Sequence, residues 1–207
     1  MGDVKLAGPM WRALELAWEA YRARSLPIGA VLVDGVGAVI AEGRNRIGEL
    51  DGPPGRLRNT ALAHAEMDVL AQLPLGSYES CTLFTSLEPC LLCRSATVMP
   101  GVGTVRFLGR DALCEGLDRL ADVNDHARRR HPTMRGPEHN VWARFATVLP
   151  LAILCALDRD GASMAAHRRH APPDAAAAER IVVDGLWPSR RLDLVDAVAW
   201  LRPVLAG

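Results

Sequence analysis

The sequence predicts an α/β fold in which helices cover a β-sheet. Its 207 residues are 49% hydrophobic and 23% charged, a balance typical of a globular protein with a sizeable core. Between residues 10 and 108, short apolar runs alternate with segments that have helical spacing or composition. Such alternation is typical of layered α/β architectures.

The first expected elements are a helix and a β-hairpin. In Met10–Arg24 the apolar residues recur at the spacing of an amphipathic helix, which Pro27 ends. Two apolar runs, 28–33 and 38–41, flank a glycine-containing turn, and this pattern indicates a hairpin. The Gly- and Pro-rich segment 49–59 is expected to be a loop.

Two helices and two strands should follow in alternation. Thr60–Leu73 contains good helix formers and is followed by a proline, so it predicts a helix. Cys81–Ser86 is apolar enough for a third strand. Cys90–Met99 comes directly after a proline and predicts a short helix, and Val102–Leu108 predicts a fourth strand.

Beyond residue 110 the pattern is weaker. Asp111–Asp125 is acidic and expected to be helical in part, and His126–Pro137 is expected to be an exposed loop. Val141–Leu157 is apolar on nearly all sides, which predicts a buried core element or a subunit interface. His167–Ala178 is interpreted as a linker, and Ile181–Leu205 is apolar again.

Charge, cysteine content and hydropathy limit the classes of function. The 24 basic and 24 acidic residues cancel, whereas a protein with a broad phosphate-binding surface is usually basic. Five cysteines do not indicate a disulfide framework. The apolar stretch Phe145–Leu157 is too short to span a bilayer, and residues 1–16 lack the apolar core of a signal peptide. We therefore expect a cytoplasmic protein without a membrane anchor.

Two short motifs carry the candidate chemistry. His64-Ala65-Glu66 lies near the start of one expected helix, and Pro89-Cys90-Leu91-Leu92-Cys93 opens another. One histidine and two thiolates are three good zinc ligands, and catalytic zinc sites keep three protein ligands with a fourth position for water. The spacing of Cys90 and Cys93 lets both sulfurs reach one ion from the first turn of a helix, whose positive end favours thiolates.

Glu66 is the candidate proton carrier. It lies two residues from His64, too close along the chain to be a fourth ligand in the same geometry. Bound zinc lowers the pKa of water to about 7, and a neighbouring carboxylate can accept that proton and return it to the substrate. The H-x-E motif followed by P-C-x-x-C is the signature of zinc-dependent deaminases.

Two other interpretations of these motifs are less well supported. A redox-active Cys90/Cys93 pair beside an unrelated His64 and Glu66 would leave the paired helix starts unexplained. A purely structural zinc site lacks a fourth cysteine or histidine near either motif. The remaining histidines are expected not to bind metal; they are His126, His131, His139, His167 and His170.

With these motifs the sequence resembles the cytidine/deoxycytidylate deaminase superfamily, in the branch that contains tRNA adenosine, guanine and fungal-type cytosine deaminases. The segments that carry the resemblance are Pro27–Val33, Gly43–Arg46, Ala63–Met67, Thr85–Cys93 and Val105–Phe107. The resemblance implies a three-layer α/β/α fold with a five-stranded mixed sheet. It also implies one zinc ion per subunit and a homodimer.

The resemblance further implies substrate contacts. The side chain of Asn45 would hydrogen-bond the ring, the backbone of Ala65 and the side chain of Ile28 would border the pocket, and Asp111 would lie near the substrate. Each polar residue has an alternative interpretation. Asn45 could be a turn residue, and Asp111 could cap a helix.

Departures from the family pattern bear on the substrate. The segment Thr60–Ala63 lacks the Asp-Pro pair of tRNA adenosine deaminases, the C-terminal part lacks their basic final helix, and Asp68 stands where small-molecule enzymes often carry asparagine. We therefore expect hydrolytic deamination of a small amino-heterocycle, with tRNA adenosine deamination as the alternative. A third hypothesis is a non-catalytic partner subunit. Residues 1–125 are expected to form the zinc deaminase domain and 126–207 a partly helical C-terminal extension, packed on the core or at a dimer interface.

Overall fold

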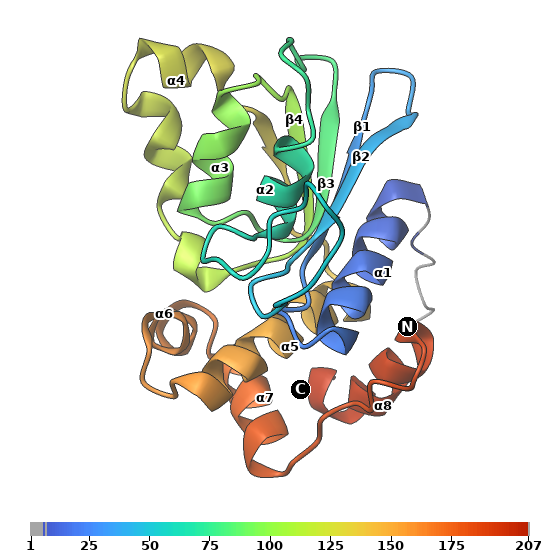
Figure 1. Ribbon diagram of the computed structural model, residues 1–207. Helices are drawn as coiled ribbons and strands as arrows, with labels where there is room; N and C mark the ends of the chain where they lie inside the picture. The colour runs from blue at the N-terminus through green and yellow to red at the C-terminus, as the bar shows by residue number, and fades with distance from the viewer. Residues whose placement is uncertain (1–5, 7, 207) are drawn as a thin grey trace.

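A five-stranded mixed sheet forms the centre of the protein (Figure 1). The computed structural model describes residues 6 and 8–206, so part of the N-terminal segment discussed above lies outside the described residues. The strand order is β2-β1-β3-β4-β5; β1 pairs antiparallel with β2 and β3, whereas β4 pairs parallel with β3 and β5. The strands are β1 (Gly29–Val33), β2 (Val39–Arg44), β3 (Thr82–Leu87), β4 (Thr104–Gly109) and β5 (Thr133–Arg135).

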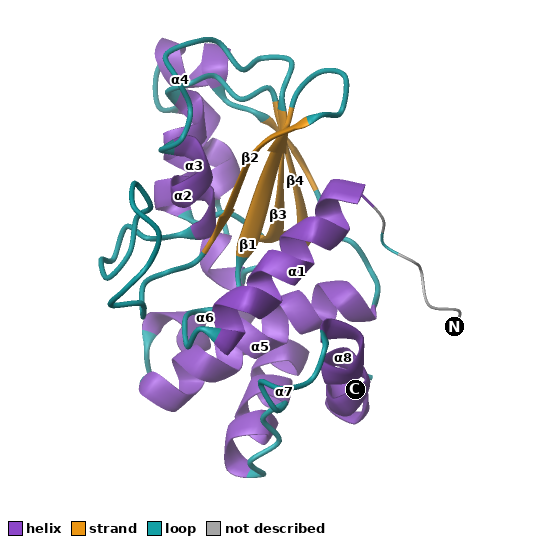
Figure 2. Cartoon of the chain, turned by 45° about the vertical axis from the view of Figure 1, so that its right-hand side comes forward, coloured by secondary structure: helices purple, strands orange, loops and turns teal. Residues whose placement is uncertain are grey.

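Helices cover both faces of the sheet, which gives three layers (Figure 2). Side chains along a strand point alternately to the two faces. In β1, Ala30 and Leu32 pack in a cluster with residues of α2 (Ala65–Leu70), whereas Val31 and Val33 pack with residues of α1 (Gly8–Arg22). Because both faces are covered, every residue of β1 is buried. The predicted α/β class and the three-layer fold with a five-stranded mixed sheet are therefore confirmed.

The elements predicted before residue 110 are present, with one change of length. The predicted hairpin is β1 and β2, and the helix expected after Pro89 is α3 (Leu91–Val98). The helix expected over Thr60–Leu73 begins only at Ala65. The residues before it form tight turns instead, in which the amide of Ala63 bonds the carbonyl of Thr60.

The exposed loop expected over 126–137 is wrong. This segment forms most of α4 (Asp125–Arg130) and the edge strand β5. The side chain of Asn124 accepts a hydrogen bond from the amide of Ala127 and so caps α4, a start signal that the run of arginines obscured. Two short 3₁₀ helices, Ala112–Cys114 and Leu117–Asp122, lie before α4. The acidic segment is therefore helical in part, as predicted.

The linker expected over 167–178 is also wrong. The chain there forms the end of α6 (Ala162–His170) and most of α7 (Pro172–Val183). Proline is compatible with the first turn of a helix, and the alanines that follow are strong helix formers. Ala175, Ala178 and Ile181 are buried against the core, so α7 is a packed element.

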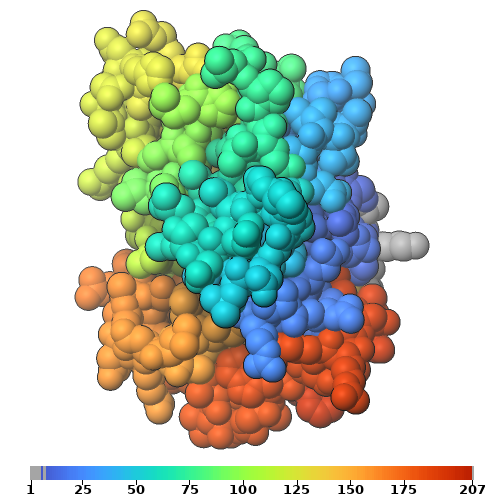
Figure 3. All heavy atoms as spheres, viewed as in Figure 1, coloured from blue at the N-terminus to red at the C-terminus, as the bar shows by residue number. Residues whose placement is uncertain are grey.

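The C-terminal helices form one end of the molecule (Figure 3). Helix α5 (Val141–Leu157) is buried over most of its length, which confirms the core element predicted there. It shares a hydrophobic cluster with α1, α7 and α8 (Leu194–Leu205). The division of the chain into a domain and an extension at residue 126 stays a prediction. After that residue, β5 still adds the fifth strand to the sheet, and α5 packs against β4. Among the described residues, no helix combines the length and hydropathy needed to cross a membrane.

Gly109, at the end of β4, lets α5 approach the sheet closely. A Cβ atom added there would lie 2.6 Å from Oγ1 of Thr147 and 2.8 Å from the carbonyl oxygen of Ala143. We expect Gly109→Ala to lower the free energy of unfolding by about 1–3 kcal/mol, because the backbone of α5 must move. Urea unfolding measures this, with Gly76→Ala as the control, since the nearest atom there is 3.6 Å away. Equal stability of the two variants would contradict the close packing of α5.

Candidate metal centre and active site

Three metal-binding side chains meet at one edge of the sheet. His64 is the N-terminal cap of α2, Cys90 is the N-terminal cap of α3, and Cys93 lies in the first turn of α3. Their ligand atoms all lie within 4.8 Å of one another. The Nδ1 atom of His64 is 3.6 Å from Sγ of Cys90 and 3.4 Å from Sγ of Cys93.

These separations fit a tetrahedral zinc ion. Zn–S bonds of about 2.3 Å and Zn–N bonds of about 2.0–2.1 Å at a tetrahedral angle put nitrogen and sulfur about 3.5 Å apart. The three donors therefore have both the chemistry and the spacing for zinc, as predicted. Among the described residues no fourth histidine or cysteine joins the cluster, which leaves a coordination position for water.

Glu66 lies beside this cluster and is only 3% exposed. Its Oε2 atom accepts a hydrogen bond from Sγ of Cys93 at 3.4 Å, and its Oε1 atom accepts one from Oγ1 of Thr85 at 3.4 Å. Burial raises the pKa of the Glu66 carboxyl above its ordinary value. A carboxyl with a raised pKa exchanges protons more readily near neutral pH.

The two thiols differ in their pKa values. A hydrogen bond from Cys93 lowers the pKa of Cys90 to about 4, although burial opposes the change. The same hydrogen bond with Cys90, together with burial, raises the pKa of the Cys93 thiol. Without a metal, the pair thus favours one thiolate and one thiol, and zinc binding releases the remaining proton because only thiolates coordinate.

A cavity of about 210 Å³ lies next to the cluster, and His64, Glu66 and Cys90 line it. The strand topology explains why. β1 begins, and β2, β3 and β4 end, at the same edge of the sheet, so Ile28, Asn45, Glu88 and Asp111 follow or precede strands there. The loops at this edge can therefore supply both metal ligands and pocket walls.

The four residues expected to contact substrate all lie at this edge. Ile28 and Asp111 line the cavity, whereas Asn45 and Ala65 are fully buried and are not among the residues that line it. The amide of Asn45 bonds the carbonyl of Ile28 at 2.9 Å, its Oδ1 accepts from the amide of Ile47, and its Nδ2 is buried without a partner. Asp111 also caps the 3₁₀ helix Ala112–Cys114, which confirms its interpretation as a helix cap, whereas its contact with substrate stays a prediction.

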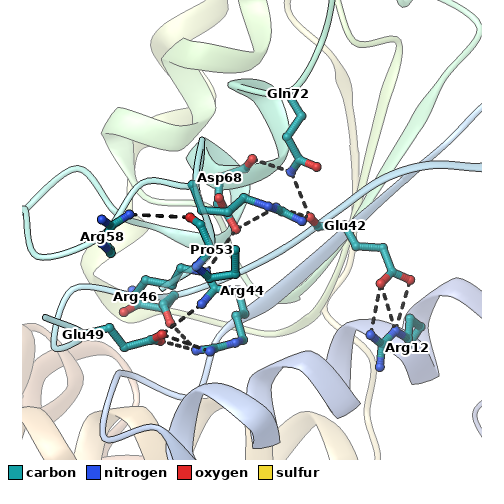
Figure 4. A network of polar contacts seen from close by, with 11 residues as sticks. Arg12, Glu42, Arg44, Arg46, Glu49, Pro53, Arg58, Asp68 and Gln72 are labelled. Carbon is teal, nitrogen blue, oxygen red and sulfur yellow. Dashed lines mark hydrogen bonds and ion pairs between the residues drawn. The ribbon is translucent and has the colours of Figure 1, made fainter. Parts of the chain in front are cut away.

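A network of ion pairs holds the segment that carries Asn45 (Figure 4). Glu49 pairs with both Arg44 and Arg46, on either side of Asn45. Asp68, on α2, is 1% exposed in its side chain and pairs with Arg56 at 3.0 Å and with Arg46 at 3.6 Å. Asp68, where the sequence departs from the pattern of small-molecule deaminases, therefore has a structural role: its ion pairs connect the segment around residue 46 to α2.

Sequence reasoning missed His167. The sequence predicts a linker at this residue, but His167 lies on α6, is 3% exposed and lines the cavity. Its Nδ1 donates to the carbonyl of Ser163 at 2.9 Å, and its Nε2 accepts from the amide of Ala112 at 3.2 Å, 3.7 Å from Oδ1 of Asp111. Local sequence contains no signal for this contact, because it joins residues far apart in the chain.

We expect His167→Ala to lower the free energy of unfolding by about 1–3 kcal/mol, because the buried amide of Ala112 loses its acceptor. Thermal unfolding measures the change. His170→Ala is the matched control, since His170 is exposed on the same helix. If the two variants unfold at the same temperature, the contact between α6 and the Asp111 turn carries no stability.

Comparison with known proteins agrees with the geometry. The family model described as the cytidine and deoxycytidylate deaminase zinc-binding region matches residues 6–108, about half of the chain, and includes all three metal ligands and Glu66. Cytosine deaminase from Candida albicans is 29% identical over 123 residues, which cover 55% of this chain and 77% of that protein.

Two bacterial relatives have other substrates in their names. A tRNA-specific adenosine deaminase from Aquifex aeolicus is 29% identical over 123 residues, covering 58% of this chain and 76% of that protein. Guanine deaminase from Bacillus subtilis is 39% identical over 90 residues, covering 41% of this chain and 52% of that protein. The family model covers all three metal ligands and Glu66, and on this ground the chain belongs to the cytidine and deoxycytidylate deaminase superfamily of zinc-dependent hydrolases.

Proposed function

We propose that this protein catalyses the hydrolytic deamination of a small amino-heterocycle: a nucleobase, a nucleoside or a related compound. The observation that carries the proposal is the buried Glu66 carboxyl, which lies beside the cluster of three zinc-binding residues and lines the same cavity as His64 and Cys90. Each half of this arrangement is needed, since hydrolysis of an amine requires both an activated water molecule and a proton carrier.

The residues divide the reaction between them. His64, Cys90 and Cys93 would hold one zinc ion per chain, which as a Lewis acid makes water a better nucleophile. Glu66 accepts one proton from the attacking water and passes it to the ring nitrogen. The second proton of the same water molecule goes to the amino group that leaves. A C–O bond forms, the C–N bond breaks, and ammonia leaves with its electron pair.

Substrate contacts follow from the same edge of the sheet. The Nδ2 atom of Asn45 is buried without a partner, and an unsatisfied donor of this kind favours a ligand acceptor nearby. The backbone of Ala65 and the side chains of Ile28 and Asp111 are proposed to complete the contacts with the ring.

Editing of adenosine in tRNA is the alternative. The similarity to the Aquifex aeolicus protein supports it, but no lysine or arginine of the described chain lines the cavity. A path for an RNA backbone needs such side chains. We therefore propose a small substrate first and keep tRNA editing as the alternative.

Ammonia release distinguishes these activities. The zinc-loaded protein would be incubated with cytosine, adenine, guanine, their nucleosides and a tRNA anticodon stem-loop. Release from a small compound supports the proposal and identifies the ring. Release from the stem-loop alone would replace it by tRNA editing.

Location and assembly are further proposals. All five cysteines are free, which supports a reducing compartment and hence the cytoplasm. A homodimer is proposed from the family resemblance alone, and light scattering in solution would test it.

A further inference from the structure

The C-terminal helices supply one wall of the cavity, and the part of this wall that comes from α5 is mostly apolar. Pro150, Leu151 and Leu154 of α5 line the cavity together with Thr147, and Ser163 and His167 come from α6. Apolar residues from the loops at the sheet edge, Leu26 and Ile28 among them, also line it. A ligand in this cavity would therefore contact the metal cluster and also a largely apolar surface.

The wall is fixed by direct contacts to the segment that contains Asp111, which also lines the cavity. Oγ1 of Thr147 donates to the carbonyl of Arg110 at 2.9 Å, and Nε2 of His167 accepts from the amide of Ala112. Both partners lie in the turn that follows β4 and contains Asp111. Because α5 and α6 are tied to this turn, the distance between the wall and the metal cluster is set by the fold.

The charged groups of the cavity are acidic. Glu66, Glu88 and Asp111 line it, and no lysine or arginine of the described residues does. Away from the metal cluster, a phosphate group in the cavity would meet carboxylates and apolar side chains without a lysine or arginine as partner. Its desolvation would then be uncompensated. The cavity volume of about 210 Å³ is also below the range of about 300–1,000 Å³ typical of pockets for larger ligands.

We propose that the wall formed by α5 and α6 selects an uncharged amino-heterocycle that bears a small apolar substituent, and that it rejects ribosyl and phosphorylated forms of the same ring. This inference rests on the proposed function, because it assumes that the amine of the ring lies at the metal cluster. Leu154 is the residue chosen to test selection, because it is half-buried and lines the cavity.

Four forms of each ring test the proposal. Cytosine, adenine and guanine would be compared with their N-propyl derivatives (N1 for cytosine, N9 for the purines), their nucleosides and their nucleoside 5′-monophosphates. Within each set the reacting amine is constant and only the substituent changes. For the ring that is used, we expect the propyl derivative to exceed the nucleoside in kcat/KM by at least about tenfold, since several CH₂ groups contact apolar side chains. The monophosphate should not react.

A matched pair of variants tests whether the wall formed by α5 and α6 causes the preference for the propyl derivative. Leu154→Asn should reduce the preference for the propyl derivative over the nucleoside by about tenfold. Leu157→Asn makes the same change on the same helix at a residue that is 78% exposed, and it should leave the preference unchanged. Equal effects of the two variants, or an unchanged preference in Leu154→Asn, would overturn the proposal.

Binding separates failure of this inference from failure of the proposed function. Calorimetry with zinc-loaded Glu66→Gln protein measures affinity for the same compounds without turnover. Tighter binding of a propyl derivative than of its nucleoside and monophosphate supports the inference, whether or not the wild type releases ammonia. Monophosphate or nucleoside binding that equals or exceeds propyl binding, or no binding of any propyl derivative, would overturn it.

Discussion

Glu66→Gln is expected to reduce the rate of ammonia release by about 10²- to 10⁴-fold, because the amide cannot move a proton between water and the ring. The side chain keeps its size and its hydrogen bond with Thr85, so the fold and zinc content should be unchanged. Steady-state kinetics on the substrate found in the panel measures the loss, and metal analysis checks the zinc.

Glu79→Gln is the matched control for this experiment, since Glu79 is exposed and does not line the cavity. It should behave as the wild type. A Glu66→Gln protein that keeps more than about a tenth of the wild-type rate would assign the proton transfer to another group. An unchanged biological effect of Glu66→Gln would favour the hypothesis of a non-catalytic partner subunit.

Loss of a metal ligand should have an effect of similar size. In Cys93→Ser a thiolate ligand becomes a hydroxyl, which is a poor zinc ligand. We expect the zinc content to fall well below one ion per chain and deamination to be lost. Because Cys93 is fully buried, we also expect the variant to have a lower free energy of unfolding than the wild type when both are measured with zinc.

Cys155→Ser controls for the chemical change alone. Cys155 is a free, buried cysteine in α5, distant in sequence from the motifs and absent from the ligand cluster. It should keep one zinc ion per chain. If Cys93→Ser also bound one zinc ion tightly, the assignment of Cys93 as a ligand would be wrong.

The metal centre could be predicted from sequence because its chemistry is local. His64 and Glu66 lie within one turn of chain, as do Cys90 and Cys93, and each pair lies at a helix start. Only the meeting of the two pairs depends on the fold. The order of strands and helices between residues 10 and 108 supplied that information, because it brings both helix starts to one edge of the sheet.

The far wall of the pocket could not be predicted in the same way. Contacts such as His167 with Ala112 and Thr147 with Arg110 join residues more than thirty positions apart and leave no periodic pattern. Composition was also misleading there. The Pro- and Ala-rich start of α7 is compatible with a linker as well as with a helix, and its packing against α5 and α6 favours the helix.

The substrate contacts could be predicted less well than the metal centre but better than the far wall of the pocket. Asn45 and Asp111 come from the resemblance, and the structure places both at the predicted edge of the sheet. Their roles toward a ligand stay predictions. Asp111 illustrates why, since one carboxylate both caps a 3₁₀ helix and lines the cavity.

Isotope incorporation during turnover tests the central claim most directly. The zinc-loaded protein would deaminate its substrate in water enriched in ¹⁸O, and both ammonia and the mass of the product would be measured. Hydrolysis at this site predicts one ammonia for every substrate consumed, and ¹⁸O at the carbon that lost the amine in proportion to the enrichment of the water. No ammonia from any amino-heterocycle tested, despite one zinc ion per chain, would contradict the claim, as would ammonia without ¹⁸O in the product.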